Sequence, residues 1–460
     1  MQKKTEIPND VERLKALVVK LLARVEQLET ENAELKRRLD MNSSNSHKPP
    51  SSDGLKKVKK KTGLPKEAKA KGGQQGHQGK TLEQVAEPEH IELHLATGCS
   101  CCGRKFTAEL AAIEIVEKRQ VFDLPPARLE VTEHRLGKIE CCGKEHQGVF
   151  PSEVKARTQY GPGVNAFATM LSVDYKIPLE RISLLFADRY GYELNSATVL
   201  TSLKRGYDLL APTEASIKHR IIETRLAHFD ETGIRCDAQT NWLHTASTAD
   251  YTHLFMHKKR GKEALECDDS VLKDFKGIAV HDCWASYFSF TNCRHVLCGA
   301  HLLRELNALM ENGSRWARAM HAFLIKLYQQ ARPLMATKKH LRRYHSILKQ
   351  ADKEEPPPQQ AKRGRPKQSV GRCLLNRLKK YQDGVLAFAF EDDIPFSNNQ
   401  AERDIRPAKV KQKITGGFRT QAGAKHYVRI QAVISTLRKQ GLNTFDELRQ
   451  VFAKNKVLLF

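Results

Sequence analysis

The segment TRLAHFDETGIR, residues 224–235, decides the fold that this sequence predicts. It indicates a β-strand that carries one acid, Asp230, in its interior. Two further strand patterns follow it, NWLHTAST at 241–248 and THLFMHKK at 252–259, with polar breaks around them. Together these segments predict three consecutive strands of one sheet.

A helix and two more strands are predicted next. The segment GKEALECDDSVLKDF (261–275) indicates the helix, and GIAVHD (277–282) indicates a buried strand that ends in Asp282. A fifth strand, HVLCGAH (295–301), runs into another helix. This is the order of elements in an RNase H-like core: three meander strands, a helix, a strand, a connection and a final strand.

In that order Asp230 and Asp282 lie on adjacent strands. Apolar residues precede each acid, so both strands are expected to be buried. Isolated acids at strand ends are commonly surface or capping residues. Two buried carboxylates are costly unless a cation or hydrogen-bond donors satisfy them, so this pair can converge on one metal centre.

A third carboxylate is expected on a nearby helix, and Glu402 in SNNQAERDIRPAKVKQ (397–412) fits. Ser397 and Gln400 predict a capping box that starts this helix, and Pro407 is expected to kink or end it. The simpler alternative is that Glu402 is a salt-bridged surface acid. Four nearby cations are predicted to contact DNA phosphates: Arg403, Arg406, Lys409 and Lys411.

Three carboxylates suit Mg²⁺ or Mn²⁺, and two such ions serve in-line phosphoryl transfer. In this interpretation Asp230 bridges both ions, Asp282 holds one and Glu402 holds the other. Water attacks first and frees a 3′-hydroxyl, which then attacks the target phosphodiester. His301, Arg304 and Glu305 in AHLLRE (300–305) are candidates to orient metals or DNA, although His301 is equally well a structural histidine.

The chain's charge points to a polyanionic partner. The 460 residues carry 77 Lys and Arg against 53 acids, a net charge of +24, which favours nucleic acid through counterion release. No run approaches the roughly 20 apolar residues that span a bilayer, and the N-terminus lacks a signal-peptide pattern, so a cytoplasmic protein without membrane contact is expected. Its eleven cysteines are then reduced.

Two cysteine clusters predict a structural zinc ion. Cys99 and Cys102 form a CxxCG knuckle, and the adjacent Cys141 and Cys142 supply the second half only in a strained loop, with His146 as an alternative fourth ligand. A metal-free strand domain is the other interpretation.

The N-terminal part predicts a dimer. Val11, Val18, Val25 and Leu39 share one heptad position with Asn32, a pattern typical of a parallel, register-fixed coiled coil. The second apolar heptad position is occupied by Leu14, Leu21, Leu28 and Leu35. An amphipathic helix packed on its own domain is the alternative.

Three further segments are candidate DNA contacts. Residues 48–80 hold ten lysines, including Lys57 and Lys60, against two acids, and indicate a basic linker or a solubilising spacer. Residues 163–211 predict three helices, with a helix-turn-helix pattern around Gly191 and an N-cap at Ser196. Within a helical insertion after residue 301, Arg363 and Arg365 resemble an AT-hook core or belong to a basic loop without base preference.

Several ordered motifs give the sequence a specific resemblance. GGQQGHQGKTL, HFDETG, HDCWASYF, AHLLRE and SNNQAERDIRPAKVKQKITGGFRT occur in order after the predicted coiled coil. Over nearly its whole length the chain resembles the transposases of bacterial insertion-sequence family sixty-six. The resemblance implies a DDE recombinase on an RNase H-like fold with Asp230, Asp282 and Glu402 as its triad. It also implies that Lys409 contacts donor-end DNA and that companion proteins of the same element take part.

The predicted fold class is multidomain α+β. It comprises a coiled coil (1–47), a basic flexible linker (48–86), a zinc-ribbon-like domain (87–155), a helical DNA-binding domain (156–215), the first part of an α/β RNase H-like core (216–300), a helical insertion (301–390) and the second part of the core with C-terminal helices (391–460). The expected function is DNA transposition by binding element ends and target DNA. A non-catalytic DNA-binding regulator and an RNase H-like structure-specific nuclease are the alternatives.

Overall fold

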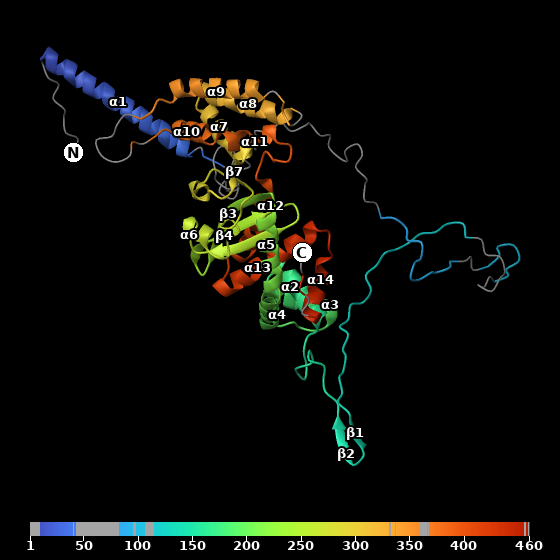
Figure 1. Cartoon of the computed structure of the whole chain (residues 1–460). Helices are drawn as coiled ribbons and strands as arrows, with labels where there is room; N and C mark the ends of the chain where they lie inside the picture. The colour runs from blue at the N-terminus through green and yellow to red at the C-terminus, as the bar shows by residue number, and fades with distance from the viewer. Residues whose placement is uncertain are drawn as a thin grey trace, which may run out of the picture. The chain divides into compact units, whose positions relative to one another are not determined.

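The computed structural model shows a mixed α/β protein (Figure 1). It describes residues 10–39, 41–42, 82–94, 98–105, 115–330, 333–335, 337–358, 366, 368–454, 457–458 and 460. The chain divides into two units. One comprises Met1–Pro65, Phe150–Leu184 and Leu194–Phe460, and the other comprises Lys66–Val149 and Leu185–Glu193.

A five-stranded mixed sheet forms the centre of the first unit, in the order β5-β4-β3-β6-β7. Its strands are β3 (Leu226–Cys236), β4 (Gln239–Ser247), β5 (Thr252–His257), β6 (Ile278–His281) and β7 (Arg294–Leu297). The first three pair antiparallel, while β6 runs parallel to both β3 and β7. The five strands predicted from the sequence are therefore present, and those carrying or preceding Asp230 and Asp282 are neighbours.

Two apolar clusters cover the two faces of this sheet. Successive side chains of a strand point to opposite faces, and on β6 Ala279 belongs to one cluster while Ile278 and Val280 belong to the other. The first cluster joins the sheet to α5 (Ala211–Glu223) and α13 (Gln421–Lys439). The sheet is thus buried on both faces along its parallel edge, which fits the apolar composition of β6 and β7.

The helix predicted at 261–275 is mostly wrong. Only α6 (Lys262–Glu266) is helical, and Cys267 is extended. The Asp268-Asp269-Ser270 sequence that follows favours turns because its short polar side chains compete for backbone groups. The apolar residues of the predicted helix are still buried: Val271, Leu272 and Phe275.

The helices before the sheet are α2 (Pro162–Val173), α3 (Leu179–Tyr190), α4 (Ser196–Leu209) and α5. The first three match the predicted helices, and Gly191 has a positive φ of 71° in the turn between α3 and α4. The predicted N-cap at Ser196 is wrong, because the Asn195 side chain accepts from the Ala197 N–H at 2.8 Å instead. The sequence did not predict α5, which crosses the expected domain boundary at residue 215.

Among the described residues, five helices separate β7 from the helix that carries Glu402. They are α7 (Gly299–Glu311), α8 (Arg315–Gln329), α9 (Thr337–Glu354), α10 (Val370–Lys380) and α11 (Gln382–Phe390). Buried Trp316 and Tyr344 lie in the apolar cluster that joins these helices to β6 and β7. The insertion predicted after residue 301 is helical in its described part.

Glu402 lies on α12 (Asn399–Thr415), and the capping box predicted for this helix is wrong. Its N-cap is Asn398, so Ser397 and Gln400 form no capping box. Pro407 does not end the helix, which continues for two more turns to Gly416, a residue with φ of 74°. Burial of Ile405 and Ala408 on either side of the proline holds this segment against the core.

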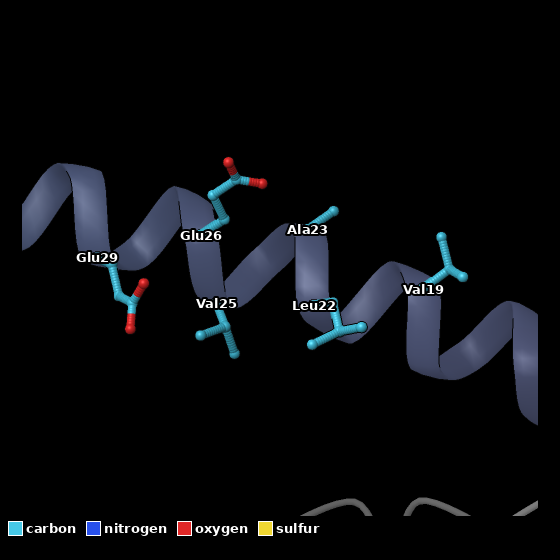
Figure 2. A pocket seen from close by; sticks show the side chains of 6 residues that line it. All are labelled: Val19, Leu22, Ala23, Val25, Glu26 and Glu29. Atoms are coloured by element: carbon cyan, nitrogen blue, oxygen red, sulfur yellow. The ribbon is translucent and has the colours of Figure 1, made fainter.

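The N-terminal helix α1 (Val11–Leu39) has an exposed apolar seam. Val18 is 47% exposed and Leu35 is 58% exposed, although both are large apolar residues. Figure 2 shows the side chains of Val19, Leu22 and Val25 projecting from this helix. None of the helices among the described residues combines the length and apolar composition that crossing a bilayer would require.

The second unit contains a short antiparallel hairpin of β1 (Lys138–Cys141) and β2 (Lys144–Gln147). Its two-residue turn is Cys142-Gly143, with φ of 55° and 74°. Positive φ at both turn positions is typical of a type I′ hairpin. The second cysteine cluster therefore sits at a tight turn, with Cys142 in the left-handed conformation.

Candidate active site

Asp230 and Asp282 extend from paired parallel strands. His228 of β3 is opposite Val280 of β6, so both acids lie two residues beyond this pair, Asp230 within β3 and Asp282 just after β6. Burial raises the pKa of Asp230 well above its usual value, and the charges of Glu231, Asp282 and Glu402 raise it further. The structure thus brings all three predicted acids close enough for their charges to interact, although 171 residues of sequence lie between Asp230 and Glu402.

Glu402 reaches this neighbourhood from α12, with its side chain 24% exposed. Arg304 on α7 places Nη2 at 3.4 Å from Glu402 Oε1, and Arg304 Nη2 also lies 3.3 Å from His301 Nε2. Arg406, one turn along α12, lies 4.0 Å from Glu402. His301 and Arg304 are therefore beside the third acid. Glu305 pairs with Arg377 on α10, with Arg377 Nη1 3.0 Å from Glu305 Oε1.

Glu231 is a fourth acid in this site that the sequence analysis missed. Its carboxylate accepts from Arg260 Nε at 2.8 Å and from the hydroxyl of Tyr287. Burial and then the charge of Asp282 raise the pKa of Glu231, and the bonds from Tyr287 and Arg260 partly offset this. The only signal for Glu231 in the sequence is its position next to Asp230 in HFDETG, because its partners Arg260 and Tyr287 are distant in sequence.

Arg260 also connects Glu231 to the loop that holds Asp282. Its guanidinium lies over two rings, 4.9 Å from the Trp242 centroid and 4.3 Å from the Trp284 centroid. The Trp284 backbone N–H in turn donates to Asp282 Oδ1 at 2.9 Å. The arrangement orients Asp282.

Asn398 joins the strand of Asp230 to the helix of Glu402. Its Nδ2 donates to the carbonyl oxygen of Phe229 at 2.7 Å, and its Oδ1 accepts from His228 Nδ1 at 2.9 Å. Burial lowers the pKa of His228, which keeps the ring neutral. The Asn398 carbonyl accepts the Glu402 N–H at 3.3 Å, so one buried side chain fixes where α12 begins relative to β3.

Replacing Asn398 with alanine is expected to lower the free energy of unfolding by about 2–4 kcal/mol, since His228 and the Phe229 carbonyl would lose buried partners. Urea unfolding followed by tryptophan fluorescence measures this, because all three tryptophans lie in the same unit. The exposed neighbour Asn399 is the matched control, and Asn399→Ala should change stability by less than about 0.5 kcal/mol. Equal losses in both variants would contradict this role for Asn398.

Asp404, two residues after Glu402, anchors the same helix. Its Oδ2 accepts from Lys439 Nζ at 2.6 Å and from Thr252 Oγ1 at 3.0 Å. Lys439 also donates to the carbonyl oxygens of Thr248 and Tyr251, each at 2.8 Å. This buried pair has its hydrogen bonds satisfied, so it ties α12 to the ends of β4 and β5 and to α13.

The four cations predicted to contact phosphates differ in their surroundings. Arg403 and Arg406 are exposed, and Arg403 bonds to Gln400 at 2.7 Å. The ammonium of Lys409 donates to the Gly233 carbonyl, and that of Lys411 donates to the Ser172 carbonyl at 3.1 Å. Burial lowers the pKa of Lys409, and it lowers that of Lys411 to about 8. In this structure the two lysines hold the backbone of their own unit.

The oxygen donors of Asp230, Asp282 and Glu402 fit a hard divalent cation such as Mg²⁺ or Mn²⁺. Burial and the charges of neighbouring acids raise the pKa of Asp230, and such a cation would relieve both effects. Within the described ranges, no three histidine, cysteine, aspartate or glutamate side chains lie together as a ready-made metal site. A cation would therefore have to draw these carboxylates closer.

The first cysteine cluster has the backbone of a metal knuckle. The Gly103 N–H donates to the Cys99 carbonyl at 3.0 Å, and Gly103 has φ of 70°. Backbone N–H groups of Cys102 and Cys101, and then the Cys102 side chain, lower the pKa of the Cys99 thiol. This favours the thiolate, which is the form that binds zinc. In the second cluster the sulfur atoms of Cys141 and Cys142 are 3.7 Å apart.

Four predicted DNA contacts lie outside the described residues: Lys57, Lys60, Arg363 and Arg365.

Comparisons with known families agree with these features. The family model described as "Transposase IS66 family" matches residues 157–426, which include Asp230, Asp282 and Glu402. The model described as "zinc-finger binding domain of transposase IS66" matches residues 96–143, a range that holds all five cysteines of the two clusters and ends before His146. A family of unknown function matches residues 2–83. No curated protein matches the sequence.

Proposed function

Because the chain belongs to the IS66 transposase family, we propose that it cuts and joins DNA at transposon ends with Asp230, Asp282 and Glu402 as a DDE triad. One observation carries this proposal: Asp230 and Asp282 each lie two residues beyond the same residue pair of two parallel strands, and Glu402 on α12 approaches closely enough for its charge to raise the pKa of Asp230. The central strand β3 beside parallel β6 supports an RNase H-like interpretation of the fold.

The reaction consists of two phosphoryl transfers at one site. Water attacks a phosphodiester at the transposon end, so a bond forms between phosphorus and the water oxygen while the bond to the 3′-oxygen breaks. The released 3′-oxygen takes a proton and becomes a hydroxyl. That hydroxyl then attacks a target phosphodiester, which releases the target's own 3′-oxygen.

The protein positions its acids for both steps. When bound by these carboxylates, Mg²⁺ or Mn²⁺ supplies activation of the attacking oxygen and stabilisation of the leaving one. The Trp284 N–H orients Asp282, and Asn398 sets the start of the helix that carries Glu402. Arg304, already 3.4 Å from Glu402, is placed to exchange this partner for a DNA phosphate. The exposed side chain of Arg406 can bind a neighbouring phosphate.

The zinc-finger match supports DNA binding by the second unit, with Cys99, Cys102, Cys141 and Cys142 as zinc ligands. A zinc ion there would hold the fold of that unit and take no part in phosphoryl transfer. The helix-turn-helix role of residues 163–211, the seven-segment domain division and the companion proteins of the element remain predictions.

We also propose that α1 forms a parallel homodimer through its exposed seam. Val18→Glu is expected to convert the dimer to a 52.2 kDa monomer, because the glutamate would be buried between two helices. Light scattering after gel filtration measures the mass. Val19 is the matched control, since it is the adjacent valine, is 66% exposed and lies outside the seam. A monomeric wild type, or equal dissociation by Val19→Glu, would contradict the seam.

Incubating the protein with labelled candidate end DNA and Mg²⁺ tests the proposed function. Strand cleavage that exposes a 3′-hydroxyl at the element end is expected, and it should disappear in Glu402→Gln while end binding persists. Unchanged cleavage by Glu402→Gln would remove this residue from the triad.

A further inference from the structure

We propose that the outer face of α9 is a binding surface for the phosphate backbone of duplex DNA. This inference rests on the proposed function, because it assigns a surface to DNA that extends away from the cleaved bond. The inner face of α9 is apolar and buried through Tyr344, Ile347, Leu348 and Ala351. Its outer face presents six exposed cations: Lys338, Lys339, Arg342, Arg343, Lys349 and Lys353.

These cations form one continuous stripe. At about 100° per residue, Lys338, Arg342, Lys349 and Lys353 fall within a sector of about 60°, and Lys339 and Arg343 widen it on one side to about 140°. The buried residues lie on the opposite side of the helix. At 1.5 Å per residue the stripe is about 22 Å long. It is therefore a linear array of positive charge on a well-supported helix.

Acidic residues do not compensate this stripe. No acid occurs in α9 before Asp352, which pairs with Arg372 on α10 at 2.9 Å and with Lys379 at 2.5 Å. Glu354 accepts from the backbone N–H groups of Arg315 and Trp316 at the start of α8, at 3.0 and 3.1 Å. Both acids thus serve neighbouring helices, and none of the six cations forms an ion pair with an acid in the part of the chain that the structure describes.

A linear polyanion fits this geometry. Duplex DNA carries one phosphate charge per about 1.7 Å of axis, so the stripe matches the length of about six base pairs. Long lysine and arginine side chains can follow the phosphates without reading bases. A membrane surface does not fit, because an amphipathic helix binds lipid through an exposed apolar face, and that face of α9 packs in the core of the helical insertion.

The test measures binding of the full chain to a 30-base-pair duplex without element-end sequence, in buffer without added Mg²⁺ and over a range of salt concentrations. The variant K338Q/K349Q/K353Q removes three charges and keeps good helix formers. It is expected to reduce the slope of log affinity against log salt by about 3, and affinity at 0.15 M salt on the order of 100-fold. The control K218Q/K262Q/K273Q removes the same charge from lysines that already contact Asp268 or Glu266.

An unchanged slope in the α9 variant, or an equal fall in the control, would overturn the proposal. The proposal would also be overturned if the α9 variant lost binding to poly-glutamate but retained binding to the duplex, because α9 would then be a surface for an acidic protein. These outcomes are separate from failure of the proposed function, because binding is measured without cleavage. If the protein binds the duplex through α9 but never cleaves end DNA, the α9 surface is supported and the catalytic assignment is contradicted.

Discussion

Asp230→Asn is expected to lower the rate of 3′-end cleavage by more than about 10³-fold while leaving end-DNA affinity within about twofold of wild type. Asparagine keeps the size and the hydrogen-bonding geometry of the side chain but removes its charge. Asp230 is the acid on which the other carboxylates act, so its loss removes the centre of the proposed cation site. Single-turnover cleavage of labelled end DNA measures the rate, and gel shift measures the affinity.

Asp250→Asn is the control for this experiment, because Asp250 is an exposed acid in the turn between β4 and β5 of the same sheet. It should cleave at the wild-type rate. Removal of Asp230's charge should also make the isolated protein more stable, because the raised pKa of Asp230 shows that its ionised form is unfavourable where it is buried. Cleavage by Asp230→Asn at a rate near wild type would exclude the residue from catalysis.

The second large effect concerns zinc. The purified chain is expected to contain about one zinc ion, held by Cys99, Cys102, Cys141 and Cys142. Cys102→Ser is expected to lose this ion, because a structural zinc contributes about 10–16 kcal/mol to a small domain and serine is a poor replacement for thiolate. Metal analysis of the dialysed protein measures the stoichiometry, and limited proteolysis of residues 96–143 measures the loss of structure.

Cys101 provides the matched control for Cys102. It lies in the same knuckle, but its spacing from Cys99 does not make a CxxC pair. Cys101→Ser is therefore expected to keep the zinc. His146→Ala tests the alternative fourth ligand, and retention of zinc in that variant is expected because the zinc-finger match ends at residue 143. Zinc-free wild-type protein, or zinc loss caused equally by Cys101→Ser, would contradict this assignment.

The strands were predictable because their signal is local. Phe229 before Asp230, and Ile278 and Val280 before Asp282, are buried in β3 and β6, so the pattern of each short segment was enough to predict its strand. The start of α12 was not predictable in the same way. Ser397 and Gln400 have the spacing of a capping box, but the side chain of Asn398 bonds to β3, about 170 residues away in sequence, and this tertiary contact decides the helix boundary.

Side-chain partners in the site show the same limit. Glu231 acquires its role from Arg260 and Tyr287, which reach it only after the sheet has formed. Lys409 and Lys411 carry the expected charge, but in the folded chain their ammonium groups donate hydrogen bonds to backbone carbonyl groups of β3 and α2. The sequence indicates which residue types a phosphoryl-transfer site needs, whereas long-range packing decides which of them remain available to DNA.

Joining of a pre-cleaved end tests the central claim most directly. The wild-type protein would be incubated with a labelled element end that already carries a 3′-hydroxyl, a target plasmid and Mg²⁺, beside Glu402→Gln. The proposed transposase should link the labelled strand covalently to the plasmid, and Glu402→Gln should bind the end without joining it. Hydrolysis without joined product in the wild type would instead identify a nuclease, and equal joining by Glu402→Gln would contradict the triad.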